Sequence, residues 1–224
     1  MSTGGNKMKI AITLFLAGML LVFTGCGNQE NTGKTEAGVE KPKVDLHSAV
    51  VTDDMEAIRQ HIASGSDLNV LEPSRASTPL ITAAAMGKTE AAGLLIKGGA
   101  DLNYQNADGG TALHTAAVFG NTAIAELLID AGADLNRQNN YGATPLHTAA
   151  FFCRKEIVKA LLEKGADKTI KNKMGQTALE TVESPFDQVK NAYDQVAAGL
   201  KPLGLKLDME HIRKTRPEIA AILR

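Results

Sequence analysis

Only a few side chains in this 224-residue sequence have the type and spacing to take part in chemistry. His114 and His147 occur in two similar segments, and an imidazole can act as a base or as a metal ligand. No constellation of nucleophile and base converges on either histidine. No Cys/His cluster has metal-ligand spacing, and no glycine-rich phosphate loop opens a predicted helix. We therefore expect no catalytic residue, no metal, no cofactor and no small-molecule substrate.

Cys26 has the clearest chemical context in the sequence. Lysines 7 and 9 precede an apolar run at residues 10–23, which is too short to span a bilayer but suits a secretory signal. The run leads into Phe-Thr-Gly-Cys and resembles the lipobox of bacterial lipoproteins, with phenylalanine in place of the usual leucine. The resemblance implies that residues 1–25 are removed and that Cys26 carries a diacylglyceryl thioether. An ordinary cleaved signal and an uncleaved anchor are the alternatives, and Met8 is a second candidate start.

Residues 26–43 are then the lipidated cysteine and a flexible tether. This segment is rich in Gly, Asn, Glu, Thr and Lys and has no aromatic residue, so it cannot bury enough apolar surface to order itself. Two or three acyl chains on Cys26 would hold the protein stably on a bilayer. We expect a location in the cell envelope, outside the cytoplasm and lipid-anchored to a membrane.

The rest of the sequence repeats two short phrases at a fixed interval. The first phrase contains a threonine that recurs with constant spacing, at Thr78, Thr111, Thr144 and Thr177. The second, Gly-Ala-Asp-Leu-Asn, begins at residues 99 and 132, decays at 165, and has an earlier copy at 65. The earlier copy lies one position further upstream than this spacing requires, which places a single inserted residue within 71–76. A constant period of about 33 residues is typical of stacked-repeat proteins.

These phrases resemble those of ankyrin repeats, in which Thr-Pro-Leu-His opens the first of two helices. The resemblance covers residues 44–200. It implies an all-α fold, an ankyrin-repeat solenoid of about five helix-turn-helix repeats with short β-turn fingers, followed by a helical C-terminal cap at residues 201–224. It also gives His114 and His147 a structural role, bonding backbone groups at the repeat turn.

Local sequence chemistry agrees with helical hairpins. Thr111 and Thr144 suit the N-cap position, and prolines 79 and 145 suit the first helical position. Gly87 and Gly120 suit the left-handed residue that ends the first helix. Apolar residues at 124, 127 and 128 predict the buried face of a second helix.

Further helices are predicted near the C-terminus, among them a short one capped by Asp208 that precedes the last. Ser184 and the following proline predict the start of one that runs to residue 200. The capping box at residues 215–218 predicts a last helix from Pro217.

Cys153 occupies the position that Gly87 and Gly120 hold in their repeats. We therefore expect it at positive φ, which costs a non-glycine residue about 1 kcal/mol. One interpretation is an inert, half-buried thiol, and the other is a redox-active thiol in an oxidising compartment.

In the ankyrin family, the finger tips and the exposed side of the first helix form a concave binding face. Repeat register places the predicted partner-binding residues there: Met86, Val118, Phe119, Asn140, Tyr141, Phe151, Phe152, Lys173 and Met174. A row of large apolar side chains on such a face indicates an interaction site. The alternative is that Phe119 and Phe152 pack between neighbouring repeats, because large apolar residues are usually buried.

The formal net charge of −1 gives no electrostatic reason to bind nucleic acid. The predicted function is that of a non-enzymatic, membrane-anchored module that binds a protein partner through its concave face. One alternative is a specific inhibitor or immunity-type protein for an extracytoplasmic enzyme. Another is stress or redox protection through Cys153.

Overall fold

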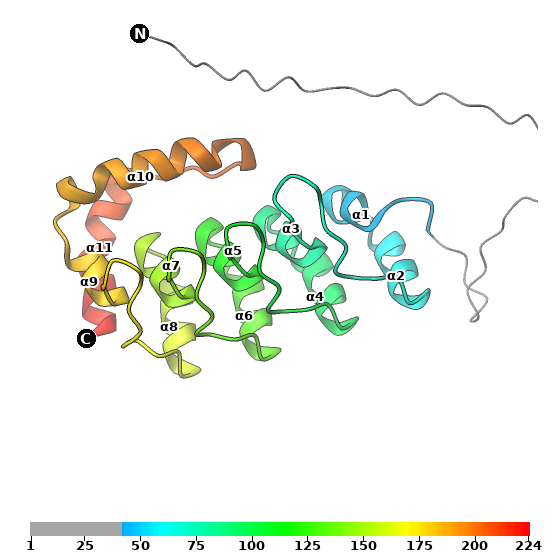
Figure 1. The fold of residues 1–224 in the computed structure, drawn as a ribbon, viewed down its shortest axis with the longest axis horizontal. Helices are drawn as coiled ribbons and strands as arrows, with labels where there is room; N and C mark the ends of the chain where they lie inside the picture. The colour runs from blue at the N-terminus through cyan, green and yellow to red at the C-terminus, as the bar shows by residue number, and fades with distance from the viewer. Residues whose placement is uncertain (1–41) are drawn as a thin grey trace, which may run out of the picture. The chain divides into compact units, whose positions relative to one another are not determined.

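The computed structural model describes residues 42–224, so the expected signal, Cys26 and residues 26–41 of the tether lie outside the described residues. Within the described range the secondary structure is entirely helical. The elements are α1 (Leu46–Thr52), α2 (Met55–Ala63), α3 (Pro79–Met86), α4 (Thr89–Lys97), α5 (Ala112–Phe119), α6 (Thr122–Asp130), α7 (Pro145–Phe151), α8 (Lys155–Glu163), α9 (Ala178–Glu183), α10 (Phe186–Leu200), η1 (Lys201–Leu203) and α11 (Met209–Leu223). Helical pairs stand side by side in chain order, which confirms the predicted repeat solenoid (Figure 1).

The first helix of each repeat is short and thin. The Thr78 hydroxyl accepts a hydrogen bond from the Ile81 amide at 3.3 Å, and Pro79 occupies the first turn. Thr111 and Thr144 cap α5 and α7 in the same way, as predicted. Paired alanines in the middle of α3, α5 and α7 are fully buried, which allows neighbouring first helices to pack closely. The helix α3 ends at Gly87 with φ of 70°, a conformation that glycine adopts without a Cβ clash.

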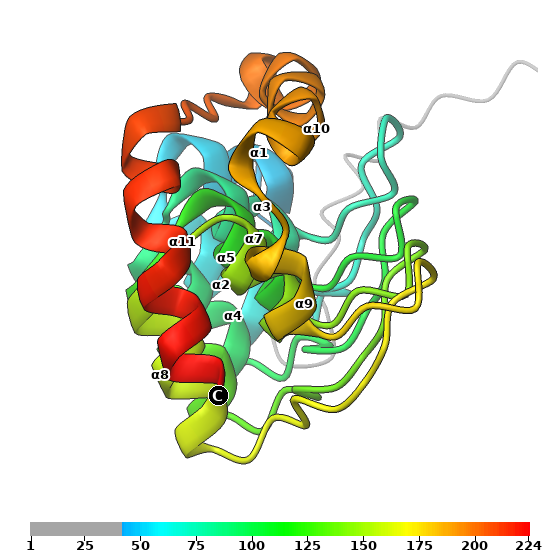
Figure 2. The ribbon, with the colours of Figure 1, turned by 90° about the vertical axis from the view of Figure 1, so that its left-hand side faces the viewer.

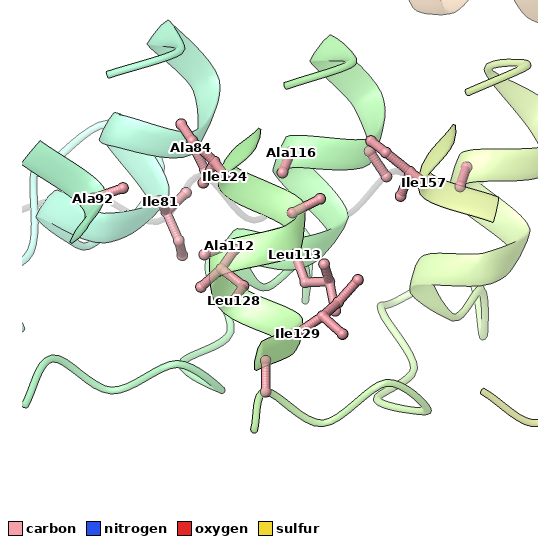
Figure 3. Packing of buried hydrophobic residues seen from close by; sticks show 14 of the residues in the cluster. Ile81, Ala84, Ala92, Ala112, Leu113, Ala116, Ile124, Leu128, Ile129 and Ile157 are labelled. Atoms are coloured by element: carbon pink, nitrogen blue, oxygen red, sulfur yellow. The ribbon is translucent and has the colours of Figure 1, made fainter. Parts of the chain in front are cut away.

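The second helices supply most of the large core side chains. Leu95, Leu128 and Leu161 are fully buried at equivalent positions of α4, α6 and α8. In Figure 3, Ile124 of α6 is drawn beside Ala84 of α3, and Leu128 of α6 beside Ala112 of α5, all within one core cluster. Each such leucine contributes roughly 1.5–3 kcal/mol by burial. The prediction that Leu127 belongs to this face was wrong: its side chain is 38% exposed, because the buried stripe passes through Ile129 instead.

Between the repeats the chain forms fingers, here defined as residues 71–77, 105–110, 138–143 and 171–176. Backbone hydrogen bonds join successive fingers into a row: the Ala107 amide donates to the Arg75 carbonyl at 2.9 Å, and the Asn140 amide to the Asp108 carbonyl at 3.1 Å. The third bond runs from the Lys173 amide to the Tyr141 carbonyl at 3.0 Å. The fingers therefore form one continuous ladder along the stack, visible on the right of Figure 2.

The first finger carries the inserted residue that the sequence predicted. In the second finger the Asn106 amide donates to the Gly110 carbonyl, whereas in the first finger Glu72 pairs with Ser77, one residue further along. The longer side chain of Glu72 spans the extra residue and accepts hydrogen bonds from the amides of Ser74 (2.8 Å) and Arg75 (2.7 Å). The hydrogen bond from the Ser74 hydroxyl, together with those from the two amides, lowers the pKa of the Glu72 carboxyl to about 2.

The fifth repeat is built differently from the others. Its first helix is α9, and α11 packs against α9 and α8 in the place that a second helix holds elsewhere, with α10 intervening in the chain. Figure 2 shows α11 beside α8 at this end of the stack. The prediction of a separate last helix from Pro217 was wrong, because α11 begins at Met209 and continues through that proline. Buried Thr215, Arg216 and Ile219 fix the helix on both sides of it.

Candidate interaction face

The inner face comprises the finger tips and the ends of the first helices. Figure 2, a view along the stack, shows the fingers to the right of the first helices and α10 above them. The predicted binding residues come from two sources on this face. Met86, Val118, Phe119, Phe151 and Phe152 lie at or just beyond the ends of α3, α5 and α7, and Asn140, Tyr141, Lys173 and Met174 lie in the third and fourth fingers.

The helix-end residues become progressively more covered along the stack. Met86 of the second repeat is 48% exposed, whereas Val118 and Phe119 of the third are half-buried. The first repeat adds an exposed Val51 at the position of Val118, a residue that the sequence-based prediction did not include. The sequence did contain the information that places Val51. Leu46-His47 aligns with Leu80 and Ile81 once the inserted residue is allowed for, and this alignment puts Val51 at the position of Val118.

At the fourth repeat the expected aromatic ladder is covered by the chain itself. Phe152 is only 7% exposed and meets Phe151 edge-on, with ring centroids 5.1 Å apart. The Phe151 ring stacks on Tyr193 of α10 at 4.2 Å. The assignment of Phe151 and Phe152 to an open binding row is therefore corrected: helix α10 covers this end of the face, and Phe152 belongs to the interior.

Tyr193 covers this position because the fifth repeat lacks a residue that would cap the end of α7. One repeat earlier, the end of α5 is capped by a residue of the fourth repeat: the Arg154 guanidinium donates to the Val118 carbonyl at 2.9 Å. The equivalent carbonyl of Phe151 accepts instead from the Tyr193 hydroxyl at 2.6 Å. Tyr193 is fully buried, so the part of α10 that carries it serves as the cap of the stack.

The buried Arg216 completes this cap. Its guanidinium donates to the Tyr193 hydroxyl at 2.8 Å and to the carbonyls of Ser184 (2.6 Å) and Thr181 (3.1 Å) at the end of α9. The negative end of a helix dipole is a favourable environment for a buried cation. Burial nevertheless raises the pKa of the Tyr193 hydroxyl to about 12, so it remains a neutral hydrogen-bonding group.

The finger residues lie in a more open environment. Tyr141 and Met174 occupy equivalent tip positions and are 70% and 78% exposed, the highest values among large apolar side chains in the described range. Lys173 is exposed beside them. Asn140 is exposed as well, but its side-chain amide donates to the Ala107 carbonyl at 2.8 Å, so part of its role is to join two fingers.

The two repeat histidines are structural. The Thr111 amide donates to His114 Nδ1 at 3.2 Å, which places the ring proton on Nε2, and Nε2 then donates to the Ala143 carbonyl at 3.0 Å. His147 makes the same pair of contacts with Thr144 and Gln176. Burial lowers the pKa of His114 to about 4 and also lowers that of His147. Both rings are thus neutral links between neighbouring repeats.

Cys153 is buried and has φ of 55°, so the predicted left-handed conformation is confirmed. Burial raises the pKa of its thiol to about 11, even though Arg216 and Arg154 lie near enough to oppose the shift. Because the thiolate is the reactive form, this environment disfavours the redox interpretation. The thiol packs against the Ile212 carbonyl of α11 at 3.7 Å, as a small core side chain.

Residues 42–224 lack the features of two other kinds of site. No helix in this part of the chain has the length and apolarity to cross a bilayer. The same residues contain no group of three or more His, Cys, Asp or Glu side chains placed to hold a metal ion.

Comparison with known families agrees with this geometry. The family model described as "Ankyrin repeats (3 copies)" matches residues 46–139 and, in a second overlapping match, residues 99–172, which together make up more than half of the chain. The chain belongs to the ankyrin-repeat family. Ankyrin arrays are protein–protein interaction modules and typically serve as scaffolds rather than enzymes. The family match includes α1 to α8 and the first three fingers and ends at residue 172, at the start of the fourth finger, so α10 and α11 lie beyond it. A search of the curated proteins found no match.

Proposed function

We propose that this ankyrin array binds a protein partner through the part of its inner face that α10 leaves open. The observation that carries the proposal is the exposure of Tyr141 and Met174 at equivalent finger tips, together with Met86 at a helix end. Aromatic and methionine side chains are enriched at the centres of protein interfaces, and water contact makes their exposure unfavourable in an unbound monomer. Polar neighbours such as Asn140 and Lys173 would form the rim.

The core of the repeats does not depend on these residues. Tyr141 and Met174 contribute exposed side chains, while the hydrogen bonds of their fingers come from backbone groups and from Asn139 and Asn172. Removing the two side chains should therefore weaken binding without loosening the fold. This separation makes the proposal testable with surface variants alone.

The test compares the full chain with the double variant Tyr141→Ser, Met174→Ser in affinity purification from membranes. Leu127→Ser is the matched control, because Leu127 is an exposed apolar residue on a second helix, away from the inner face. We expect the wild type and the control to retain the same co-purifying protein and the double variant to lose it, with equal melting temperatures. Retention by the double variant would contradict the proposal.

We further propose that the array acts outside the cytoplasm, held on a membrane by acyl chains on Cys26. The support is the sequence of residues 7–26, with its basic start, short apolar run and Phe-Thr-Gly-Cys ending. Radiolabelled palmitate should enter the wild-type protein and not Cys26→Ala. Labelling of both proteins, or of neither, would refute lipidation at Cys26 while leaving the inner-face proposal intact.

A further inference from the structure

The row of fingers has two ends, and they differ chemically. Along the row, each finger accepts one backbone hydrogen bond from the next, at the carbonyls of Arg75, Asp108 and Tyr141. The equivalent carbonyl of the fourth finger belongs to Met174, and the fifth repeat contributes no finger to follow it. No hydrogen bond to the Met174 carbonyl occurs among the described residues. Figure 2 shows the fourth finger, in yellow, outermost at this end.

The other end of the row is closed by the protein itself. The amide of Ser74 is equivalent to the donating amides of Ala107, Asn140 and Lys173. The Glu72 carboxylate already accepts the hydrogen bond of this amide at 2.8 Å. The row therefore lacks the free donor that a second copy of the chain would need in order to add head-to-tail at the open end.

The side chains at the open end differ from those along the rest of the row. Arg75 of the first finger is neutralised by Asp108 of the second at 2.6 Å. The third and fourth fingers present the exposed Tyr141 and Met174, and the fourth carries Lys171 and Lys173 without an acidic residue of its own. The open backbone edge thus coincides with an apolar tip and with positive charge.

We infer that the outer edge of the fourth finger binds an extended, acidic segment of a partner protein, which adds to the finger row as one more member. A partner amide would donate to the Met174 carbonyl, as Lys173 does to Tyr141 in the row. Alternate side chains of an extended segment point to opposite sides, so apolar residues can contact Met174 and Tyr141 while carboxylates meet the lysines. This inference rests on the proposed function and specifies the chemistry of the partner at one end of the face.

The test uses the full chain in detergent and a fluorescein-labelled synthetic peptide in which valine alternates with glutamate. Fluorescence anisotropy at low salt should show saturable binding that Lys173→Glu weakens by roughly tenfold. Lys159→Glu is the matched control, because Lys159 is an exposed lysine of the same repeat on α8. The same peptide with N-methyl groups on alternate amides should not bind, since it cannot donate to the edge.

Other results would overturn the inference in distinguishable ways. Equal binding of the N-methylated peptide would show that attraction is only electrostatic, and absence of peptide binding would show that the edge is not a site. In either case the membrane partner could still be lost in the Tyr141→Ser, Met174→Ser variant, which would leave the proposed function standing. If both experiments fail, the inner face itself is not the binding surface.

Discussion

Tyr193 and Arg216 show how one pair of side chains completes the last, altered repeat. The fifth repeat lacks an ordinary second helix directly after α9, yet the Phe151 carbonyl at the end of α7 still needs a donor, and the end of α9 still presents its carbonyls. A hydroxyl and a buried guanidinium supply all of these hydrogen bonds. Unsatisfied buried polar groups are costly, so this small network is what allows the stack to end within the protein.

Tyr193→Phe is expected to destabilise the protein by about 1–3 kcal/mol, because it leaves the Phe151 carbonyl and the buried Arg216 each without one partner. The phenyl ring would keep the stacking on Phe151, so the effect isolates the hydroxyl. Urea unfolding followed by circular dichroism measures the difference in free energy. Tyr141→Phe is the matched control: Tyr141 is largely exposed, and removal of its hydroxyl should leave the midpoint unchanged. Equal stability of both variants would refute the role given to Tyr193.

The buried His114 makes stability depend on pH in a defined direction. Its folded pKa of about 4 lies below the value of 6.5 for free imidazole, so the unfolded chain binds the extra proton more readily. The stabilisation is complete above pH 6.5 and is lost as pH falls through 4, a total of roughly 3 kcal/mol. An NMR titration of the His114 ring should show a midpoint near 4. A midpoint near 6.5 would contradict the neutral, buried role.

The first finger accommodates one inserted residue without losing its place in the ladder. Glu72 replaces the asparagine that Asn106 and Asn139 represent in later fingers, and its longer side chain reaches the amides of the enlarged loop. Ala76 adopts a mildly unfavourable conformation in this loop, with φ of 51° where Gly109 and Gly142 stand in the others. The ladder to the second finger is preserved despite the insertion.

Because Glu72 holds the first finger as a carboxylate, that finger should loosen in acid before the others. The folded pKa of about 2 lies below the ordinary value of 4.5, so the contribution is present above pH 4.5 and disappears as pH falls through 2. In an NMR titration, the amide chemical shifts of Ser74, Arg75 and Ser77 should change together with a midpoint near pH 2. In the second finger, Asn106 accepts the amides of Asp108 and Gly110 through a neutral oxygen, and these resonances should not follow that titration. A midpoint near 4.5 at Ser74 would contradict the account.

The repeats were predictable because every signal that defines them is local. Threonine caps, positive-φ glycines and the apolar residues of each hairpin lie within a single period of the sequence. The continuous helix α11 was not predictable in the same way. Pro217 behind a capping-box pattern suggests a helix start, and only contacts from α9 and α10 show that the helix continues through the proline. Proline within a helix is tolerated when tertiary packing compensates the lost hydrogen bond.

The candidate face was predictable in register but not in exposure. The sequence placed Phe119 and Phe152 at equivalent positions, yet one is half-buried and the other interior. Beside Phe152, the Phe151 ring is stacked under Tyr193, which lies 42 residues away in the sequence. The repeat period carries no information about a helix that occurs once in the chain.

Across the described stack, the inner face is closed at the fourth repeat by α10 and open at the finger tips. The same cap that completes the solenoid therefore limits where a partner can bind. Large apolar side chains remain exposed at Met86, Tyr141 and Met174, and these residues contribute little to the core. We propose that this remaining surface, rather than the second helices, contacts the partner.

The most direct test is site-specific photo-crosslinking in intact cells, with benzoylphenylalanine placed at Tyr141 and at Met86 in separate variants. The matched position is Leu127, which is exposed on α6. We expect one discrete cross-linked protein from positions 141 and 86 and none from position 127. Cross-linking from Leu127 alone, or an identical pattern from all three positions, would contradict this expectation.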